Sequence, residues 1–296
     1  MCSDHFNPWS TTQGESAHAW TWLGAALSST SLPFGVVNAP GYRYHPAIIA
    51  QAAATLSSMF PERFWFAVGS GQLLNESITG ENWPVKDSRN TRLLQCVQIM
   101  RALWAGETVT SHGHVTVENA KLWTRPAKPP LLIAAALTPQ TAEWAAGWAD
   151  GLITISKPRE KLAKVVEAWQ RGGGKKKPMF LQVKLSWADS NDEALENAWK
   201  EWRYAVSESL VQTNLPTPEA MEASAAFVKE DDMRQHIRIS SHTKDHAEQL
   251  LEDIDMGFER LFLHNVGRNQ IKFIHKFGED VLPLIAGVNR GEIDRV

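Results

Sequence analysis

The first residues that could do chemistry are Asp4, His5 and Trp9, which crowd into the nine-residue opening MCSDHFNPW. Histidine changes its charge near neutral pH, and a carboxylate beside it can orient the ring, so this pair is suited to moving a proton. Its place at the start of the chain leaves two interpretations open. It is either a ragged terminus or the rim of an active site whose supporting strand is missing.

Further candidate residues follow apolar runs that read as strands. RFWFAV is followed by GSGQLLNE (69–76), PLLIAA by ALTPQT (136–141), and DGLIT by ISKP (155–158). Ligands of parallel α/β proteins bind at the carboxyl ends of the strands, so these loops are the expected binding segments. Lys184 lies inside the apolar run LQVKLSW, where burial would demand a partner.

One of these loops carries the signature of a helix start. Thr138 is a good N-cap and Pro139 suits the first helical position, which predicts a helix N-terminus able to hold a phosphate group. A plain capped helix explains the same two residues equally well.

Metal and hydrolase chemistry find little support. His112 and His114 lie in an expected hairpin, and His242 and His246 stand four residues apart, but no third ligand is spaced convincingly and H-E-x-x-H is absent. VGSGQ does not match the G-x-S-x-G elbow, so Ser70 is a poor nucleophile. We therefore expect no metal site.

The elements that must position these residues alternate between short apolar strands and amphipathic helices. Helices are expected over 46–60 and 87–106, and strand–helix pairs repeat to the end of the chain, as one domain over 1–296. Insertions near 107–125 (a β-hairpin) and 203–243 (irregular and helical) interrupt the repeat. Repeated βα units with continuous apolar strands predict a parallel sheet buried on both faces, either an open doubly wound sheet or a (β/α)8 barrel.

Composition is that of a globular protein, with 43% hydrophobic and 21% charged residues. A net charge of −3 gives no reason to expect nucleic acid or an anionic membrane as partner. Two cysteines are too few for a disulfide framework and fit a reducing, cytoplasmic compartment. The expected partner is a small-molecule substrate.

Several long stretches resemble the luciferase-like flavin or F420-dependent oxidoreductases. They are SDHFNPW, GYRYHPAIIAQAAATLSSMFPERFWFAVGSGQLLNESITGENWP, QIMRALWAGETVTSHGHVTVENAKLW and WADGLITIS. The nearest branch contains the F420-dependent glucose-6-phosphate dehydrogenases. The resemblance implies a (β/α)8 TIM barrel, usually dimeric, with a flavin or deazaflavin across its C-terminal mouth.

The resemblance also implies residue roles. His5 would be the acid/base during hydride transfer, with Asp4 and Trp9 as further catalytic residues at the ring. The implied cofactor-binding residues are Val36, Val37, Asn38, Gly69, Ser70, Gly71, Gln72, Asn75, Ala136, Thr138, Pro139 and Gln140, with a non-prolyl cis peptide at Val36–Val37. The expected substrate-binding residues are Trp83, Ser156, Lys157 and Lys184.

Three departures from the family pattern bear on the cofactor. Gln72 stands where dehydrogenase members carry a glutamate proposed to protonate the deazaflavin, and glutamine does not transfer a proton. Residues 136–139 replace a Gly-Gly-Pro or Phe-Gly-Pro turn, and 155–157 replace part of a sugar-phosphate pocket. These changes favour FMN over F420.

Family members precede SDHF with a first strand, a helix and the body of a second strand. We therefore expect a luciferase-like barrel that lacks its first βα unit and most of strand 2. The cause would be a truncated chain, a misassigned start codon, or numbering that omits an ordered N-terminal segment.

The sequence predicts an FMN-dependent oxidoreductase that performs hydride transfer or monooxygenation on a small organic substrate. The protein would be a homodimer, served by a separate flavin reductase if it is a monooxygenase. The alternative is an F420-dependent dehydrogenase of an alcohol or sugar-like substrate. A second alternative is a ligand-binding barrel without catalysis.

Overall fold

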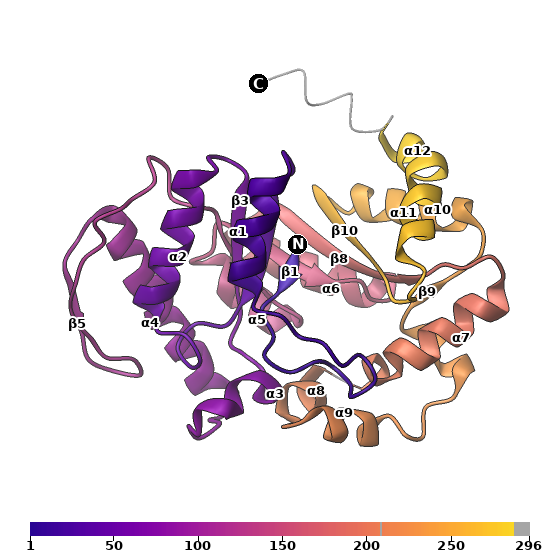
Figure 1. The fold of residues 1–296 in the computed structure, drawn as a ribbon, viewed down its shortest axis with the longest axis horizontal. Helices are drawn as coiled ribbons and strands as arrows, with labels where there is room; N and C mark the ends of the chain where they lie inside the picture. The colour runs from indigo at the N-terminus through magenta and orange to yellow at the C-terminus, as the bar shows by residue number, and fades with distance from the viewer. Residues whose placement is uncertain (208, 287–296) are drawn as a thin grey trace. The chain divides into compact units, whose positions relative to one another are not determined.

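The computed structural model describes residues 1–207 and 209–286 (Figure 1). Its contacts divide the chain into two compact units. Unit 1 consists of Met1–Ala136, Trp148–Gly151 and Ser209–Met221. Unit 2 consists of the described residues within Leu137–Gly147, Leu152–Glu208 and Glu222–Val296.

Unit 1 is built on four parallel strands in the order β1-β2-β3-β6. They are β1 (Cys2–Ser3), β2 (Phe34–Asn38), β3 (Phe64–Val68) and β6 (Leu132–Ala135). Every residue of β3 is buried, as expected of a strand covered on both faces. Because all four strands run in the same direction, the residues that follow them meet at one edge of the sheet.

The helices of unit 1 follow the apolar pattern of the sequence. They are α1 (Ala19–Ser29), α2 (Pro46–Met59), α3 (Leu73–Glu76), the 3-10 turn η1 (Ser77–Thr79), α4 (Lys86–Ala105) and α8 (Ser209–Asn214). α4 ends at Gly106, whose φ of 92° is the left-handed cap conformation that glycine adopts without strain. Strands β4 (Val109–Ser111) and β5 (Val117–Ala120) form an antiparallel pair after α4. Helix α9 (Pro218–Ser224) spans the boundary between the two units.

Unit 2 contains a second set of parallel strands, in the order β7-β8-β10. These strands are β7 (Gly151–Ile155), β8 (Met179–Ser186) and β10 (Arg260–Asn265), and the short β9 (Arg238–Ile239) also pairs with β8. β8 and β10 run side by side in Figure 1, and their register sets His264 opposite Lys184.

The helices of unit 2 again come between its strands. They are α5 (Pro139–Ala146), α6 (Arg159–Trp169), the π-helical turn η2 (Gln170–Gly174), α7 (Asn191–Trp202), the 3-10 turns η3 (Arg203–Val206) and η4 (Glu230–Gln235), α10 (Thr243–Asp255), α11 (Gln270–Asp280) and α12 (Leu282–Ala286). The alternation of strand and helix in both units confirms the α/β class. None of the helices within 1–207 and 209–286 is both long and apolar enough to cross a membrane.

Candidate active site

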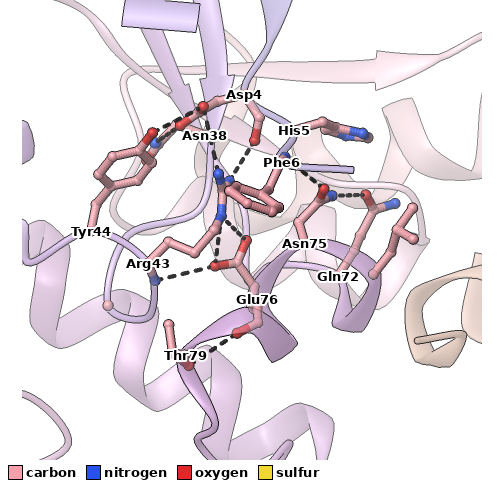
Figure 2. Close-up of polar contacts among 12 residues, drawn as sticks. Asp4, His5, Phe6, Asn38, Arg43, Tyr44, Gln72, Asn75, Glu76 and Thr79 are labelled. Atoms are coloured by element: carbon pink, nitrogen blue, oxygen red, sulfur yellow. Dashed lines mark hydrogen bonds and ion pairs between the residues drawn. The ribbon is translucent and has the colours of Figure 1, made fainter. Parts of the chain in front are cut away.

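A buried polar network lies where β1 and β2 end (Figure 2). Asp4 follows β1, is only 4% exposed, and accepts a hydrogen bond of 2.8 Å from Asn38 Nδ2 at the end of β2. Tyr44 Oη lies 3.4 Å and Arg43 Nη1 3.8 Å from the same carboxylate. The strand register places Asp4 and Asn38 together, and the loop after β2 supplies the other two side chains.

Arg43 joins this carboxylate to a second one. Its Nε lies 3.3 Å from Glu76 Oε2, and its Nη2 donates to the Asp4 backbone carbonyl at 2.6 Å. Burial raises the pKa of Glu76, and the Arg43 guanidinium acts against that rise. One buried guanidinium therefore serves two buried carboxylates, and it also holds the backbone immediately before His5.

The His5 ring lies outside this network. It is half-buried, and its centroid is 4.8 Å from that of the Trp9 ring. Burial and, to a smaller extent, the Arg43 charge lower the pKa of His5 to about 4, so the imidazole is neutral at pH 7 and able to accept a proton. Figure 2 shows the ring pointing away from Asp4. The expectation that a carboxylate holds this histidine was therefore wrong for Asp4, which faces the Arg43 side instead.

The loop that carries His5 is fastened to α3. Asn75 Oδ1 accepts from the backbone N–H groups of Phe6 (2.9 Å) and Asn7 (3.2 Å), and Asn7 Nδ2 donates to the Leu74 carbonyl at 2.6 Å. Asn75 Nδ2 lies 3.4 Å from Gln72 Oε1. The predicted residues Gln72 and Asn75 thus lie beside the His5 loop.

The segment after β3 turns sharply at Gly71, whose φ of +82° favours glycine. A Cβ there would also approach Glu76 Cγ to 3.0 Å, so the backbone passes very close to α3. Ser70 in this segment accepts a hydrogen bond of 2.6 Å from Lys86 Nζ. Burial and the neighbouring Arg89 lower the pKa of Lys86 to about 8. Sequence reasoning missed Lys86, which stands out only as a lysine opening a helix.

The remaining predicted residues of unit 1 lie outside this network of hydrogen bonds and ion pairs. Val36 is fully buried, whereas Val37 is half-buried. The described residues contain no cis peptide bond, so the expected cis bond at Val36–Val37 was wrong. Ala136 is buried directly after β6. Trp83 donates from Nε1 to Asn214 Oδ1 at 2.8 Å.

In unit 2, the predicted phosphate-binding residues surround the start of α5. Thr138 is the N-cap and accepts a hydrogen bond from the Thr141 N–H at 3.3 Å, and Pro139 and Gln140 are the first two residues of the helix. Lys157 Nζ donates to the Leu137 carbonyl just before this helix. A cation therefore lies at a helix N-terminus, which favours a negatively charged ligand group.

The predicted substrate residues of unit 2 belong to a basic cluster. Burial and the charge of Lys157 lower the pKa of Lys184 to about 8. Burial and Lys184 lower that of His264 to about 4. Ser156 is buried and accepts from the Lys184 backbone N–H at 3.0 Å, so its hydroxyl supports the strand pair. In the described part of the chain, neither Lys157 nor Lys184 has a carboxylate partner.

The strand ends of unit 1 offer a hydrogen-bond acceptor that suits a flavin-like ring. Asn38 Oδ1 is buried without a hydrogen-bond partner among the residues described, and such an atom is costly unless a ligand donor meets it. Gly69 leaves room beside it, since an added Cβ would meet only Ala135, at 3.5 Å and beyond. Flavin and deazaflavin rings carry one edge N–H, which can supply that donor. No group of His, Cys, Asp and Glu in 1–207 and 209–286 is arranged to hold a metal ion.

Comparison with known proteins decides the family, because the model of the luciferase-like monooxygenases matches residues 1–260. The chain belongs to the luciferase-like monooxygenase family. It is 32% identical over 299 residues to an F420-dependent glucose-6-phosphate dehydrogenase of Beutenbergia cavernae, covering 97% of this chain and 89% of that protein. The corresponding enzyme of Microbacterium testaceum is 31% identical over 292 residues, covering 95% and 87%.

Solved structures agree with this assignment. An F420-dependent secondary alcohol dehydrogenase in complex with an F420–acetone adduct has a TM-score of 0.84 and 26% identity, covering 96% of this chain and 88% of its own. The coenzyme F420-dependent tetrahydromethanopterin reductase of Methanopyrus kandleri shares the fold, with a TM-score of 0.75 at 17% identity over 95% and 89% of the two chains. Membership of the luciferase-like family confirms the predicted α/β barrel class and an oxidoreductase of the flavin or F420 type.

Proposed function

We propose that this protein is a coenzyme F420-dependent dehydrogenase that oxidises an alcohol group. The observation that carries the proposal is His5: a neutral imidazole beside Trp9, on a backbone segment held from both sides. The relatives named above, sugar-phosphate and secondary alcohol dehydrogenases that use F420, support it. They favour F420 over the FMN that the sequence departures suggested.

In this proposal His5 takes the proton of the substrate hydroxyl. A neutral imidazole can accept that proton. Its lowered pKa keeps it unprotonated over the whole neutral range, and also makes it a weaker base than a free histidine. F420, when bound, would accept the hydride that leaves the carbon bearing that hydroxyl. Asn38, Gln72 and the 69–71 segment are the residues of unit 1 that would hold its ring.

The basic cluster of unit 2 favours a substrate or cofactor that carries an anionic group. Lys157 and Lys184 are ammonium groups in a partly buried setting without carboxylate partners in the described chain, and an anion would offset the cost of their burial. We assign them to binding rather than to proton transfer.

One observation favours a second candidate, an FMN-dependent enzyme. Gln72 can donate a hydrogen bond to the ring edge that becomes negative when flavin is reduced, but it cannot deliver a proton to it. A glutamine there therefore suits FMN, which needs no proton at that edge, better than F420.

Titration of the purified protein with F420 and with FMN separates the two candidates. Micromolar or tighter F420 binding, with oxidation of a secondary alcohol or sugar phosphate, supports the proposal. Yellow protein that retains FMN and does not bind F420 overturns it in favour of the second candidate.

The role of His5 is tested by His5→Asn. Loss of a positioned general base lowers kcat by about 10²–10⁴-fold, while the Kd for F420 should stay within a few-fold of the wild-type value. His112→Asn, at a largely exposed histidine of the β4–β5 hairpin, is the control and should change neither quantity. Unchanged kcat in His5→Asn would remove His5 from the mechanism.

The pH dependence gives an independent check on the same base. Because the folded pKa of His5 is about 4, kcat should stay level as pH falls through 6.5 and decline only as pH approaches that value. A decline centred near pH 6.5 that disappears in His5→Asn would show that burial does not hold His5 neutral.

A further inference from the structure

Asn75 lies between the loop that carries His5 and the side chain of Gln72 (Figure 2). It is 2% exposed, lies in α3, and contacts the His5 loop with one end of its amide and Gln72 with the other. We propose that Asn75 is a positioning residue: it fixes the backbone that follows His5 and sets which end of the Gln72 amide faces a bound cofactor. The second part rests on the proposed function, whereas the first does not.

The direction of the Asn75 amide is determined by its partners. The Phe6 and Asn7 backbone N–H groups can only donate, so the atom that lies 2.9 and 3.2 Å from them is the amide oxygen. Both lone pairs of that oxygen are then used. The Asn75 NH2 group is left on the opposite side, toward Gln72.

The same reasoning orients Gln72. The Asn75 NH2 group can only donate, so the Gln72 atom 3.4 Å away from it is Oε1. The Gln72 NH2 group therefore lies at the free end of its side chain. A ligand that meets that end is offered a hydrogen-bond donor, which suits an acceptor atom or a ring edge that gains negative charge.

The backbone on either side of His5 is held by different side chains. Arg43 Nη2 binds the Asp4 carbonyl at 2.6 Å, before the histidine, and Asn75 binds the two N–H groups after it. Asn7 adds a bond from its side chain to Leu74. Loss of Asn75 therefore removes two hydrogen bonds from the later side only. The Asn7–Leu74 bond and a bond of 2.9 Å from Ser16 Oγ to the His5 carbonyl remain there, and Arg43 still holds the earlier side.

Two substitutions separate the two ends of Asn75. Asn75→Ala removes both. Asn75→Asp keeps an acceptor for Phe6 and Asn7, and a carboxylate that accepts backbone N–H bonds stays ionised, so its second oxygen cannot donate to Gln72. The Gln72 amide then turns its NH2 group toward Asp and presents its oxygen at the free end. Asn82→Ala, at an exposed asparagine of the same unit, is the control.

The first readout is amide hydrogen exchange of Phe6 and Asn7 in the cofactor-free protein. Asn75→Ala should accelerate exchange at both amides by about tenfold or more, whereas Asn75→Asp and Asn82→Ala should stay within about threefold of wild type. Equal exchange in wild type and Asn75→Ala overturns the anchoring of the His5 loop. This readout decides that part even if the protein binds neither F420 nor FMN, which would refute the proposed function instead.

The second readout is the ratio of the Kd values for oxidised and reduced cofactor, measured for whichever of F420 and FMN the wild type binds. Asn75→Asp should weaken binding of the reduced form relative to the oxidised form by about tenfold, the value of one hydrogen bond. An unchanged ratio overturns the orientation of Gln72. If Asn75→Ala fails to fold, the Asp variant, which keeps both anchoring bonds, still tests this part, and Asn75→Ser replaces Ala in the exchange measurement.

Discussion

The two units each contain a cluster of charged side chains, and the clusters differ in whether their charges are paired. In unit 1, Arg43 lies between the carboxylates of Asp4 and Glu76, and Asn38 adds a hydrogen bond. In unit 2, Lys184 lies opposite His264 in the register of β8 and β10 and within electrostatic range of Lys157, and neither lysine has a carboxylate partner in the described chain.

This difference suits the two clusters to different tasks: the unit 1 network to positioning the backbone, and the unit 2 lysines to binding an anion. A buried network whose charges are paired holds backbone in place, and its charged groups gain little from a ligand, although Asn38 Oδ1, without a partner among the described residues, can still accept a hydrogen bond from one. A cluster of one sign stores unfavourable energy that an anion can offset, and the lowered pKa of Lys184 records that energy. We therefore expect substitutions in the two clusters to change stability in opposite directions.

The largest effect should come from Arg43→Leu. It leaves two buried carboxylates without their shared cation, and breaking a buried pair in this way costs about 3–5 kcal/mol of unfolding free energy. Urea unfolding monitored by tryptophan fluorescence measures it. Arg171→Leu, which removes an exposed pair with Glu143, is the control and should cost far less than Arg43→Leu, because solvent screens an exposed pair. Equal losses in the two variants would mean that the Arg43 network is no more structural than a surface pair.

Lys184→Met should act in the opposite direction. Its folded pKa is lowered from 10.5 to about 8, so at pH 7 the folded state bears the cost of an ammonium in a poorly solvated place. Methionine fills similar space without that cost, and the unfolding free energy should rise by about 1–2 kcal/mol. Lys175→Met, at an exposed lysine, should leave it unchanged. A loss of stability in Lys184→Met would show that the ammonium is already paired.

Added anion should stabilise wild type and not Lys184→Met. Sulfate is a suitable probe because its charge is constant over the pH range, and at five times its Kd it should add about 1 kcal/mol to wild type beyond its effect on the variant. Because the folded pKa of Lys184 is about 8, the ammonium is lost as pH rises through that value, so this difference should vanish by about pH 9. A difference that persists at that pH would assign the site to other groups.

Much of the fold could be predicted from local patterns. The apolar runs RFWFAV (63–68) and LQVKLSW (181–187) cover most of β3 and β8, and the helix expected over 87–106 is α4, shifted by one residue. Those patterns depend on neighbouring residues, which the sequence displays directly. The resemblance of long stretches to one family then selected the barrel class, which the spacing of strands left open between two architectures.

The arrangement within the site could not be predicted, because it depends on residues far apart in the chain. Glu76 is 33 residues from Arg43, and no spacing rule links them. Asp4 and His5 are neighbours in sequence, which suggested a pair, yet adjacent side chains of extended backbone point in opposite directions. Lys184 and His264 meet only through the register of β8 and β10.

The smallest effect, and the finest test of pairing in unit 1, comes from two tyrosines of one loop. Tyr44 Oη donates to Asp4 Oδ1 at 3.4 Å, whereas Tyr42 Oη is buried without a partner among the described residues. Tyr44→Phe removes a long hydrogen bond from a carboxylate that keeps Asn38 and Arg43, so it should cost only about 0.5–1 kcal/mol. Tyr42→Phe removes a hydroxyl that is buried away from water without forming a hydrogen bond in return, so the change should be neutral or slightly stabilising. Urea unfolding of the two variants in parallel measures the difference, and an equal cost for both would mean that the Asp4 carboxylate gains nothing from Tyr44.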